Sequence, residues 1–204
     1  MNRRLVLASF ALCTAFAAAL PLAAQAPADG AAKKAPAGPR PRTSPHDAIY
    51  ARIDGILVAL VYGRPYSARG GKGEARKIWG GLVPYGKVWR TGSDEATLLV
   101  VEKPITVGSA TVPSGAYTLW TLPAEDGSAK LIINKQVGQW GINQQQVAQR
   151  DEKFDLAIVD LTKETLDAPV DQFTMAVMGT PGGGGMIKMS WENTAYSVKV
   201  AAAK

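Results

Sequence analysis

The fold is decided by one stretch, Ile49-Tyr50-Ala51-Arg52-Ile53-Asp54-Gly55-Ile56-Leu57-Val58-Ala59-Leu60-Val61-Tyr62. Two apolar runs flank the dipeptide Asp54-Gly55, and both are rich in residues that favour strands. Asp-Gly accepts the positive φ angles that a two-residue hairpin turn requires. The stretch therefore predicts two antiparallel strands, at residues 49–53 and 56–62, joined by a tight turn.

Short apolar runs of the same kind continue to the end of the chain, separated by residues that turn or break a strand. Further strands are predicted at residues 97–101, 105–107, 116–122, 130–134, 154–161, 172–178, 186–191 and 196–200. Helical periodicity is almost absent. Roughly ten strands with short connections predict an all-β domain, a single antiparallel β-sandwich or flattened barrel.

The N-terminus has the three parts of a secretory signal peptide. A basic segment, Asn2-Arg3-Arg4, precedes an apolar run at residues 5–20 and small residues at the exit. We expect cleavage after Ala24, because a cut after Ala26 would be hindered by Pro27. The alternative is an uncleaved anchor, but the run is shorter than the ~20 residues that span a bilayer. The expected location is periplasmic or extracellular, with no transmembrane segment after signal removal.

Three regions are expected: a signal peptide at residues 1–24, a disordered linker at 25–45 and a β domain at 46–204. The linker is rich in Pro, Ala and basic residues, and it has too few large apolar side chains to offset the entropy of ordering. It is either a spacer or a weak electrostatic contact to anionic lipid or cell wall. Cys13, the only cysteine, lies in the signal, so the mature chain has no disulfide and no thiol nucleophile.

Loss of Arg3 and Arg4 with the signal lowers the formal net charge from +6 to +4. That excess is too small to predict nucleic-acid binding.

The segment from Ile78 to Thr97 is too irregular for a plain strand and must form a specified loop. If Asp94 and Glu95 begin the strand at Thr97, their side chains leave on opposite faces and cannot both grip one glycosidic bond. We favour an ion pair between Arg90 and one of these carboxylates, which would pin the loop to the sheet. In the alternative, Arg90 presents its guanidinium to an anionic or carboxylate ligand and Glu95 orients it.

Aromatic and basic residues near this loop also allow two interpretations each. The rings of Trp79, Tyr85 and Trp89 either form a platform for sugars or cap an open end of the sandwich. The basic stretch from Arg64 to Lys77 is either a solvated loop or the mouth of an anion site. The candidate binding residues are therefore Arg64, Tyr85, Trp89, Arg90, Asp94 and Glu95.

Signatures of common catalytic and cofactor sites are missing. Neither Gly-Lys dipeptide is followed by the Ser or Thr of a phosphate-binding loop. The single histidine, His46, directly follows the linker and is set aside as a catalytic or metal-binding residue. Neither Ser93 nor Ser114 has the surroundings of a hydrolase nucleophile. We assign no catalytic residue, no metal and no cofactor.

Several motifs occur in a specific order. They are Gly80-Gly81-Leu82-Val83-Pro84-Tyr85-Gly86-Lys87-Val88-Trp89-Arg90-Thr91-Gly92 with Glu95-Ala96-Thr97, Tyr62-Gly63-Arg64-Pro65, residues 112–119, Ile133-Asn134-Lys135 with Trp140-Gly141, and Trp191-Glu192-Asn193-Thr194. This set resembles the DUF2911 family of exported bacterial proteins, from about Asp47 to Val200. The resemblance implies an exported, mainly β domain with no established activity. The chain departs from the family in Ser93-Asp94, where Ala-Asn is usual, and in residues 68–75, which look like an insertion.

Two classes of function follow. The first is a non-catalytic extracytoplasmic binding or envelope-associated module, whose ligand is a carbohydrate, a cell-wall component or a small anion. The second is an envelope hydrolase or lyase that acts on a carbohydrate-like or anionic substrate with Glu95 or Asp94 and Arg90. The missing nucleophile and metal signatures favour the first. The sequence does not predict the oligomeric state.

The signal peptide yields the first prediction. Exported protein should begin at Gln25, because the bond after Ala24 is the favoured cleavage site. Intact-mass measurement of the exported protein checks this, and a mass for all 204 residues would contradict it.

Overall fold

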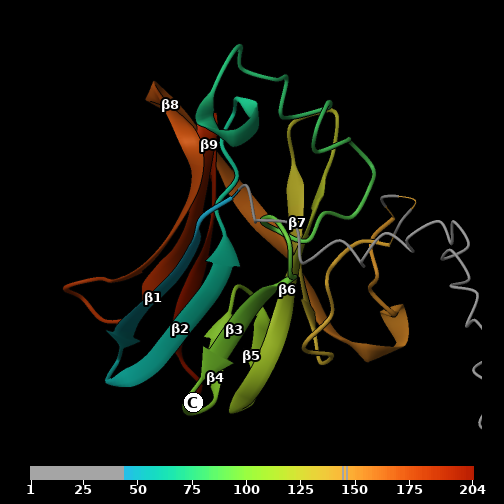
Figure 1. Cartoon of the computed structure of the whole chain (residues 1–204). Coiled ribbons are helices and arrows are strands. Elements are labelled where there is room, and N and C mark those ends of the chain that lie inside the picture. The colour runs from blue at the N-terminus through green and yellow to red at the C-terminus, as the bar shows by residue number, and fades with distance from the viewer. Residues whose placement is uncertain (1–43, 144, 146) are drawn as a thin grey trace, which may run out of the picture. The chain divides into compact units, whose positions relative to one another are not determined.

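Regular structure is almost entirely β in the computed structural model, which describes residues 44–143, 145 and 147–204 (Figure 1). The strands are β1 (His46–Ile53), β2 (Ile56–Gly63), β3 (Thr97–Val101), β4 (Ile105–Val107), β5 (Ala110–Val112), β6 (Gly115–Pro123), β7 (Ala129–Asn134), β8 (Asp155–Gly179) and β9 (Gly185–Ala202). Two short 3-10 helices, η1 (Arg69–Gly71) and η2 (Glu152–Phe154), lie in connections.

The predicted signal peptide, and the predicted linker apart from its last two residues, lie outside the described residues. Within the described part of the chain, no helix has the length and apolar character needed to cross a membrane.

The nine strands form one antiparallel sheet in the order β1-β2-β3-β6-β7-β8-β9-β4-β5. The sheet does not close into a barrel. Its first and later strands nevertheless pack together, since β1 lies next to β8 and inward residues from β2, β3, β6 and β9 share one hydrophobic core. The all-β antiparallel fold predicted from the sequence is confirmed, as a sheet folded over itself in the manner of a sandwich.

Alternation of buried and more exposed residues on β2 and β9 builds much of this core. On β2 the buried residues Ile56, Val58, Leu60 and Tyr62 alternate with more exposed ones. On β9 the fully or almost fully buried positions from 187 to 191 are Ile187, Met189 and Trp191. Burial of each large apolar side chain contributes roughly 1.5–3 kcal/mol.

Two pairs of predicted strands are single long strands in the structure. Residues 154–161 and 172–178 are largely covered by β8, and residues 186–191 and 196–200 belong to β9. Register shifts between Thr165, Val170 and Thr174 absorb the irregularity around Pro169. Proline is accepted at such bulges, so the predicted break at this point is wrong. The short strand β5 was not predicted.

The predicted hairpin is confirmed. Ile53 pairs with Ile56, and the turn residues Asp54 and Gly55 have φ angles of 50° and 80°. The Asp54 carboxylate also accepts hydrogen bonds from the backbone N–H groups of Gly184, at 2.6 Å, and Ala202, at 2.9 Å. These two bonds hold the pKa of Asp54 below its ordinary value. The turn thus fastens the β8–β9 hairpin and the end of β9 to β1.

Replacing Asp54 by Asn should therefore reduce stability in a pH-dependent way. Asn tolerates the left-handed backbone but cannot accept both bonds as a carboxylate does. Because folding lowers the pKa of Asp54, the wild type should be more stable than Asp54→Asn by the full amount above the ordinary pKa of about 3.9. This difference in the free energy of unfolding should be lost as the pH falls through the pKa of Asp54 in the folded protein. Urea unfolding of both proteins across this pH range measures the difference.

Asp160→Asn is the control, since Asp160 is exposed and its ion pair in the described residues is with the exposed Lys130. An equal difference between wild type and Asp54→Asn above and below this pH range would contradict the prediction.

Candidate functional site

The Arg90 loop, residues 89–96, is held by backbone and threonine hydrogen bonds. Trp89 and Thr121 exchange two backbone bonds of 2.8 Å. The hydroxyl of Thr97 donates to the carbonyl of Thr91 at 2.6 Å, and the hydroxyls of Thr91 and Thr121 lie 2.8 Å apart. These threonines are buried, so their hydrogen bonds fix the loop to β3 and β6.

The backbone of this loop is strained. Thr91 and Asp94 have φ angles of 56° and 65°, and only two other non-glycine residues in the described part of the chain have positive φ. A β-branched residue such as Thr91 adopts this conformation rarely. Strain of this kind costs about 1–3 kcal/mol per residue and is concentrated at functional sites.

Two glycines allow other segments to approach the loop closely. A Cβ at Gly63 would stand 2.2 Å from the carbonyl oxygen of Ser93, and one at Gly141 would stand 2.5 Å from Cδ of Arg90. Gly141 also has φ of 100°. Larger residues at these positions would displace the loop.

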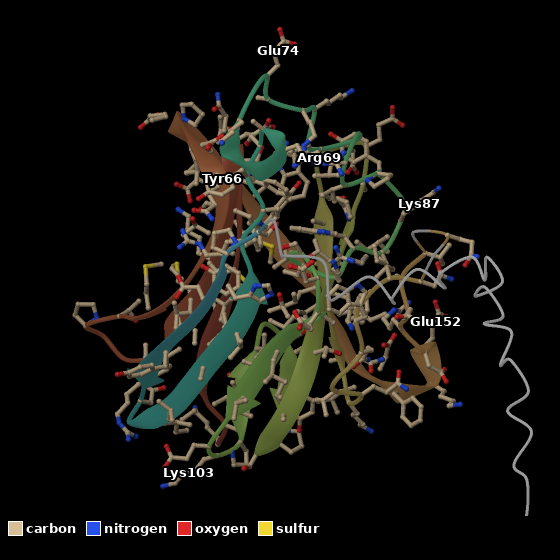
Figure 2. All side chains as sticks on the ribbon, in the orientation of Figure 1. Tyr66, Arg69, Glu74, Lys87, Lys103 and Glu152 are labelled. Atoms are coloured by element: carbon tan, nitrogen blue, oxygen red, sulfur yellow. The ribbon has the colours of Figure 1, made fainter. Side chains whose placement is uncertain are left out.

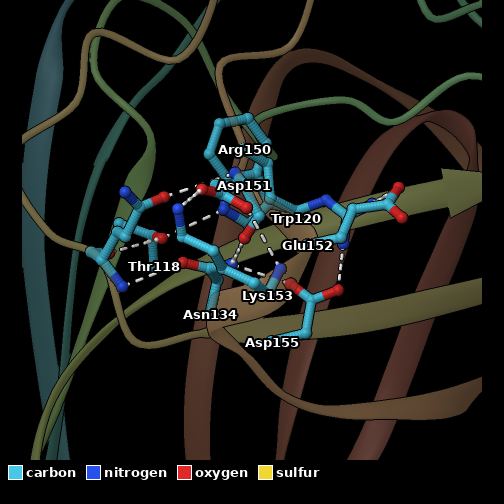
Figure 3. A network of polar contacts seen from close by, with 9 residues as sticks. Thr118, Trp120, Asn134, Arg150, Asp151, Glu152, Lys153 and Asp155 are labelled. Carbon is cyan, nitrogen blue, oxygen red and sulfur yellow. Dashed lines mark hydrogen bonds and ion pairs between the residues drawn. The ribbon is translucent and has the colours of Figure 1, made fainter.

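A buried polar network fixes the segment that contains Gly141 (Figure 3). Asn134, fully buried at the end of β7, donates to the carbonyl of Asp151 at 3.0 Å and to the carboxylate of Asp155 at 2.7 Å. Its own amide oxygen accepts from the N–H of Gln136. Arg150 forms ion pairs with Asp155 and Glu152. Both ends of the segment from 135 to 151 are thereby anchored.

Arg90 is not joined to Asp94 or Glu95 by an ion pair in the described structure, so the favoured interpretation of the sequence is not found. Its Nε donates to the carbonyl of Gly92 at 3.4 Å, and its Nη1 is buried without an acceptor. Burial lowers the pKa of Arg90, and the two carboxylates oppose that shift from a distance. The guanidinium is therefore a partly buried cation that the protein does not neutralise directly.

Both carboxylates instead approach His46. Its Nε2 lies 3.0 Å from Oε2 of Glu95 and 3.7 Å from Oδ2 of Asp94. The prediction that the two side chains leave on opposite faces is wrong, because Asp94 is in the left-handed conformation and the strand begins only at Thr97. His46, set aside in the sequence, is paired with Gly63 across β1 and β2 and so lies beside the loop.

A cavity of about 340 Å³ opens beside Arg90. Its lining includes Arg90, Lys87 and, from the basic stretch, Arg69 and Arg76. Asp94 is the only carboxylate that the described residues contribute to this lining. Arg76 is oriented by bonds of 3.0 Å and 2.7 Å to the carbonyls of Ser67 and Tyr66. Figure 2 shows Arg69 and Lys87 toward one end of the domain and Lys103 at the opposite end.

Buried polar atoms without partners gather around the same loop. They belong to Arg90, Ser93, Asp94 and Gln139, and they are all such side-chain atoms found in the described residues. Oδ2 of Asp94 is near His46 but beyond hydrogen-bonding distance. Native structures satisfy nearly all buried polar groups, so exceptions concentrated at one place indicate a functional site.

The other candidates have structural roles. Arg64 donates to the carboxylate of Asp47 at 3.2 Å and to the hydroxyl of Thr174 at 3.1 Å, which ties β1 and β2 to β8. Tyr85 packs on Gly80, where a Cβ would stand 2.5 Å from its ring. Neither residue lines the cavity beside Arg90.

The aromatic residues support the capping interpretation. Trp89 stacks on Trp191 with ring centroids 5.9 Å apart and meets Phe173 edge-on at 5.0 Å. Trp79 packs edge-on against Trp89 and Tyr196. These rings extend the hydrophobic core, and Trp89 also forms part of the cavity wall.

Within residues 44–143, 145 and 147–204, no group of three or more His, Cys, Asp or Glu side chains is arranged to hold a metal ion.

Comparison with known proteins gives one match. The family model described as "Protein of unknown function (DUF2911)" matches residues 44–200. No curated protein and no solved structure matches the chain.

Arg90 and Arg150 allow a direct test of this site. Arg90→Met should change the free energy of unfolding by less than about 1 kcal/mol, because it keeps the apolar stem and removes a cation whose Nη1 has no acceptor and whose bond to Gly92 is long. Arg150→Met should lower the free energy of unfolding by about 3 kcal/mol, because the Arg150 side chain is only 7% exposed and its loss leaves the carboxylate of Asp155 without its cation. Denaturant unfolding of both variants measures the difference, and equal costs would mean that Arg90 pins the loop.

Proposed function

Because the chain belongs to the DUF2911 family, whose function is unknown, we propose its function from the site: it is an exported, extracytoplasmic binding domain for a small anionic ligand. The signal peptide predicted at residues 1–24 supports export to the periplasm or beyond. The absence of a nucleophile motif in the sequence supports binding without turnover.

One observation carries the proposal. Arg90 has a buried Nη1 without an acceptor, beside a cavity whose lining adds Arg69, Arg76 and Lys87. A buried donor of a cation that has no acceptor is costly, and the oxygens of an anion would remove that cost. The volume of about 340 Å³ is that of a small-molecule site.

The walls favour an anion that also has an apolar part. Trp89, Trp191 and Leu82 line the cavity together with the cations. Tryptophan rings contribute contact area, while arginine forks fix carboxylate or phosphate oxygens in pairs. The ligand class is therefore a carboxylate or phosphate on a compact organic body.

Thermal unfolding with citrate and with inorganic phosphate tests the proposal against sodium chloride of equal ionic strength. A ligand that binds only the folded protein raises its stability by RT ln(1 + [L]/Kd). We expect at least one of the two probes to raise the melting temperature, and Arg90→Met to weaken its binding by about tenfold or more.

Two exposed lysines give the matched control. Lys87→Met removes a cation from the cavity lining, whereas Lys103→Met removes one at the other end of the domain (Figure 2). Binding should weaken only in the first. Equal effects of the two, or no response beyond that to chloride, would overturn the anion site.

An envelope hydrolase or lyase that uses Glu95 or Asp94 with Arg90 is the second candidate. The observation that favours it is the approach of both carboxylates to Nε2 of His46, which places protonatable groups side by side. Incubation with peptidoglycan fragments and mass spectrometry of the products tests it. New products that disappear in Glu95→Gln but persist in Lys103→Met would establish the enzyme.

A further inference from the structure

The outer face of the sheet is apolar across β1, β2 and β3. Across these strands, Tyr50 is paired with Ala59 and Ala59 with Val100, while Ala48 is paired with Val61 and Val61 with Leu98. Tyr50, Val61 and Val100 are 75%, 43% and 37% exposed. An exposed sheet face usually carries polar residues, so this face indicates a binding surface.

The adjoining part of the same face is covered. Trp120 on β6 and Ile132 on β7 are almost completely buried, and Ala148 from the segment between β7 and β8 packs on them. The exposed apolar face of β1, β2 and β3 therefore ends where the connection between β7 and β8 covers the sheet.

A hollow of about 390 Å³ lies at this boundary. Val61, Ala96 and Leu98 give it an apolar surface, and His46, Glu95 and Gln139 are polar parts of its lining. Among the described residues, no lysine or arginine lines it, in contrast to the cavity beside Arg90. An anion would meet the Glu95 carboxylate here, whose partner His46 is the only other ionisable side chain in the described lining apart from Tyr62, so the hollow suits a neutral polar ligand better.

Gln139 specifies that ligand further. Its backbone carbonyl accepts the N–H of Ala96 at 3.2 Å, which holds the residue against the Arg90 loop. The nitrogen and the oxygen of its side-chain amide are both buried without a partner. Gln139 lines the hollow, so a ligand there would reach the amide after a rotation of the side chain. A carboxamide offers two N–H donors and an acceptor oxygen, so it can donate to the carbonyl of a ligand amide or accept from its N–H.

We propose that this hollow binds a neutral sugar ring that carries an acetamido group. The apolar C–H face of the ring would rest on Val61 and Leu98, and the acetamido group would pair with Gln139. Glu95, which is partly exposed, would accept a hydroxyl from the ring. A longer glycan would continue over the exposed face toward Tyr50, whose ring offers an amphipathic surface. This site does not depend on the anionic ligand of the other cavity.

Titration calorimetry with the trimer of N-acetylglucosamine tests the proposal, with the glucose trimer as the matched sugar without acetamido groups. We expect only the first to bind. Gln139→Leu and Val61→Lys should each weaken binding by about tenfold or more, the first by removing the amide and the second by obstructing the surface.

Val147→Lys is the control, because Val147 is an exposed valine outside this hollow. It should bind as the wild type does, and the variants' folding is checked by thermal unfolding. Should Val61→Lys fail to fold, Gln139→Leu decides alone, since its amide makes no bond that the fold would lose. Absence of binding at millimolar trimer, equal binding of the glucose trimer, or unchanged binding in Gln139→Leu would each overturn the site.

Discussion

The structure depends on β8, a long strand that pairs with β7 on one side and with β9 on the other. Over its first part β8 pairs with β7, and over its second part it pairs with β9. A strand shared in this way turns a single sheet into two packed layers without closing it. It also carries Phe173 and Thr174 to the far layer, where Arg64 binds Thr174 and Trp89 packs on Phe173. The aromatic cap and one wall of the cavity beside Arg90 follow from this crossing.

Local signals predicted local structure well. The Asp54-Gly55 turn fixed the first hairpin, and β3 and β4 have the predicted bounds because short apolar runs lie between strong turn residues. The candidate site was predicted only in part, since its geometry depends on contacts between distant segments. The expected Arg90 ion pair assumed strand geometry at Asp94, but that residue has a positive φ. His46 lies beside the loop because of the register between β1 and β2, and Gln139 does so because the connection after β7 packs against the loop. Patterns in a single sequence do not reveal either contact.

Two arginines in one domain show how their partners decide their roles. Arg150 is buried with Asp155 and Glu152 within reach, so its charge is compensated and it anchors a connection. Arg90 is packed under that same connection with a single long bond to Gly92. The hydrogen-bonded network around Arg150 thus holds in place the connection that packs on Arg90, whose own hydrogen-bonding groups are not all satisfied. This arrangement is expected when a rigid shell supports a binding group.

The motifs that carry the family resemblance meet in space at the Arg90 loop. Gly63 permits the approach of Ser93, Gly141 permits the approach of Arg90, and Asn134 holds the segment that contains Gly141. These residues shape the loop without contributing charge to the cavity. Asp94 and Arg69 do contribute charge, because both line the cavity. Gly63, Gly141 and Asn134 therefore account for the shape of the site, and the charged side chains of the lining set its electrostatics.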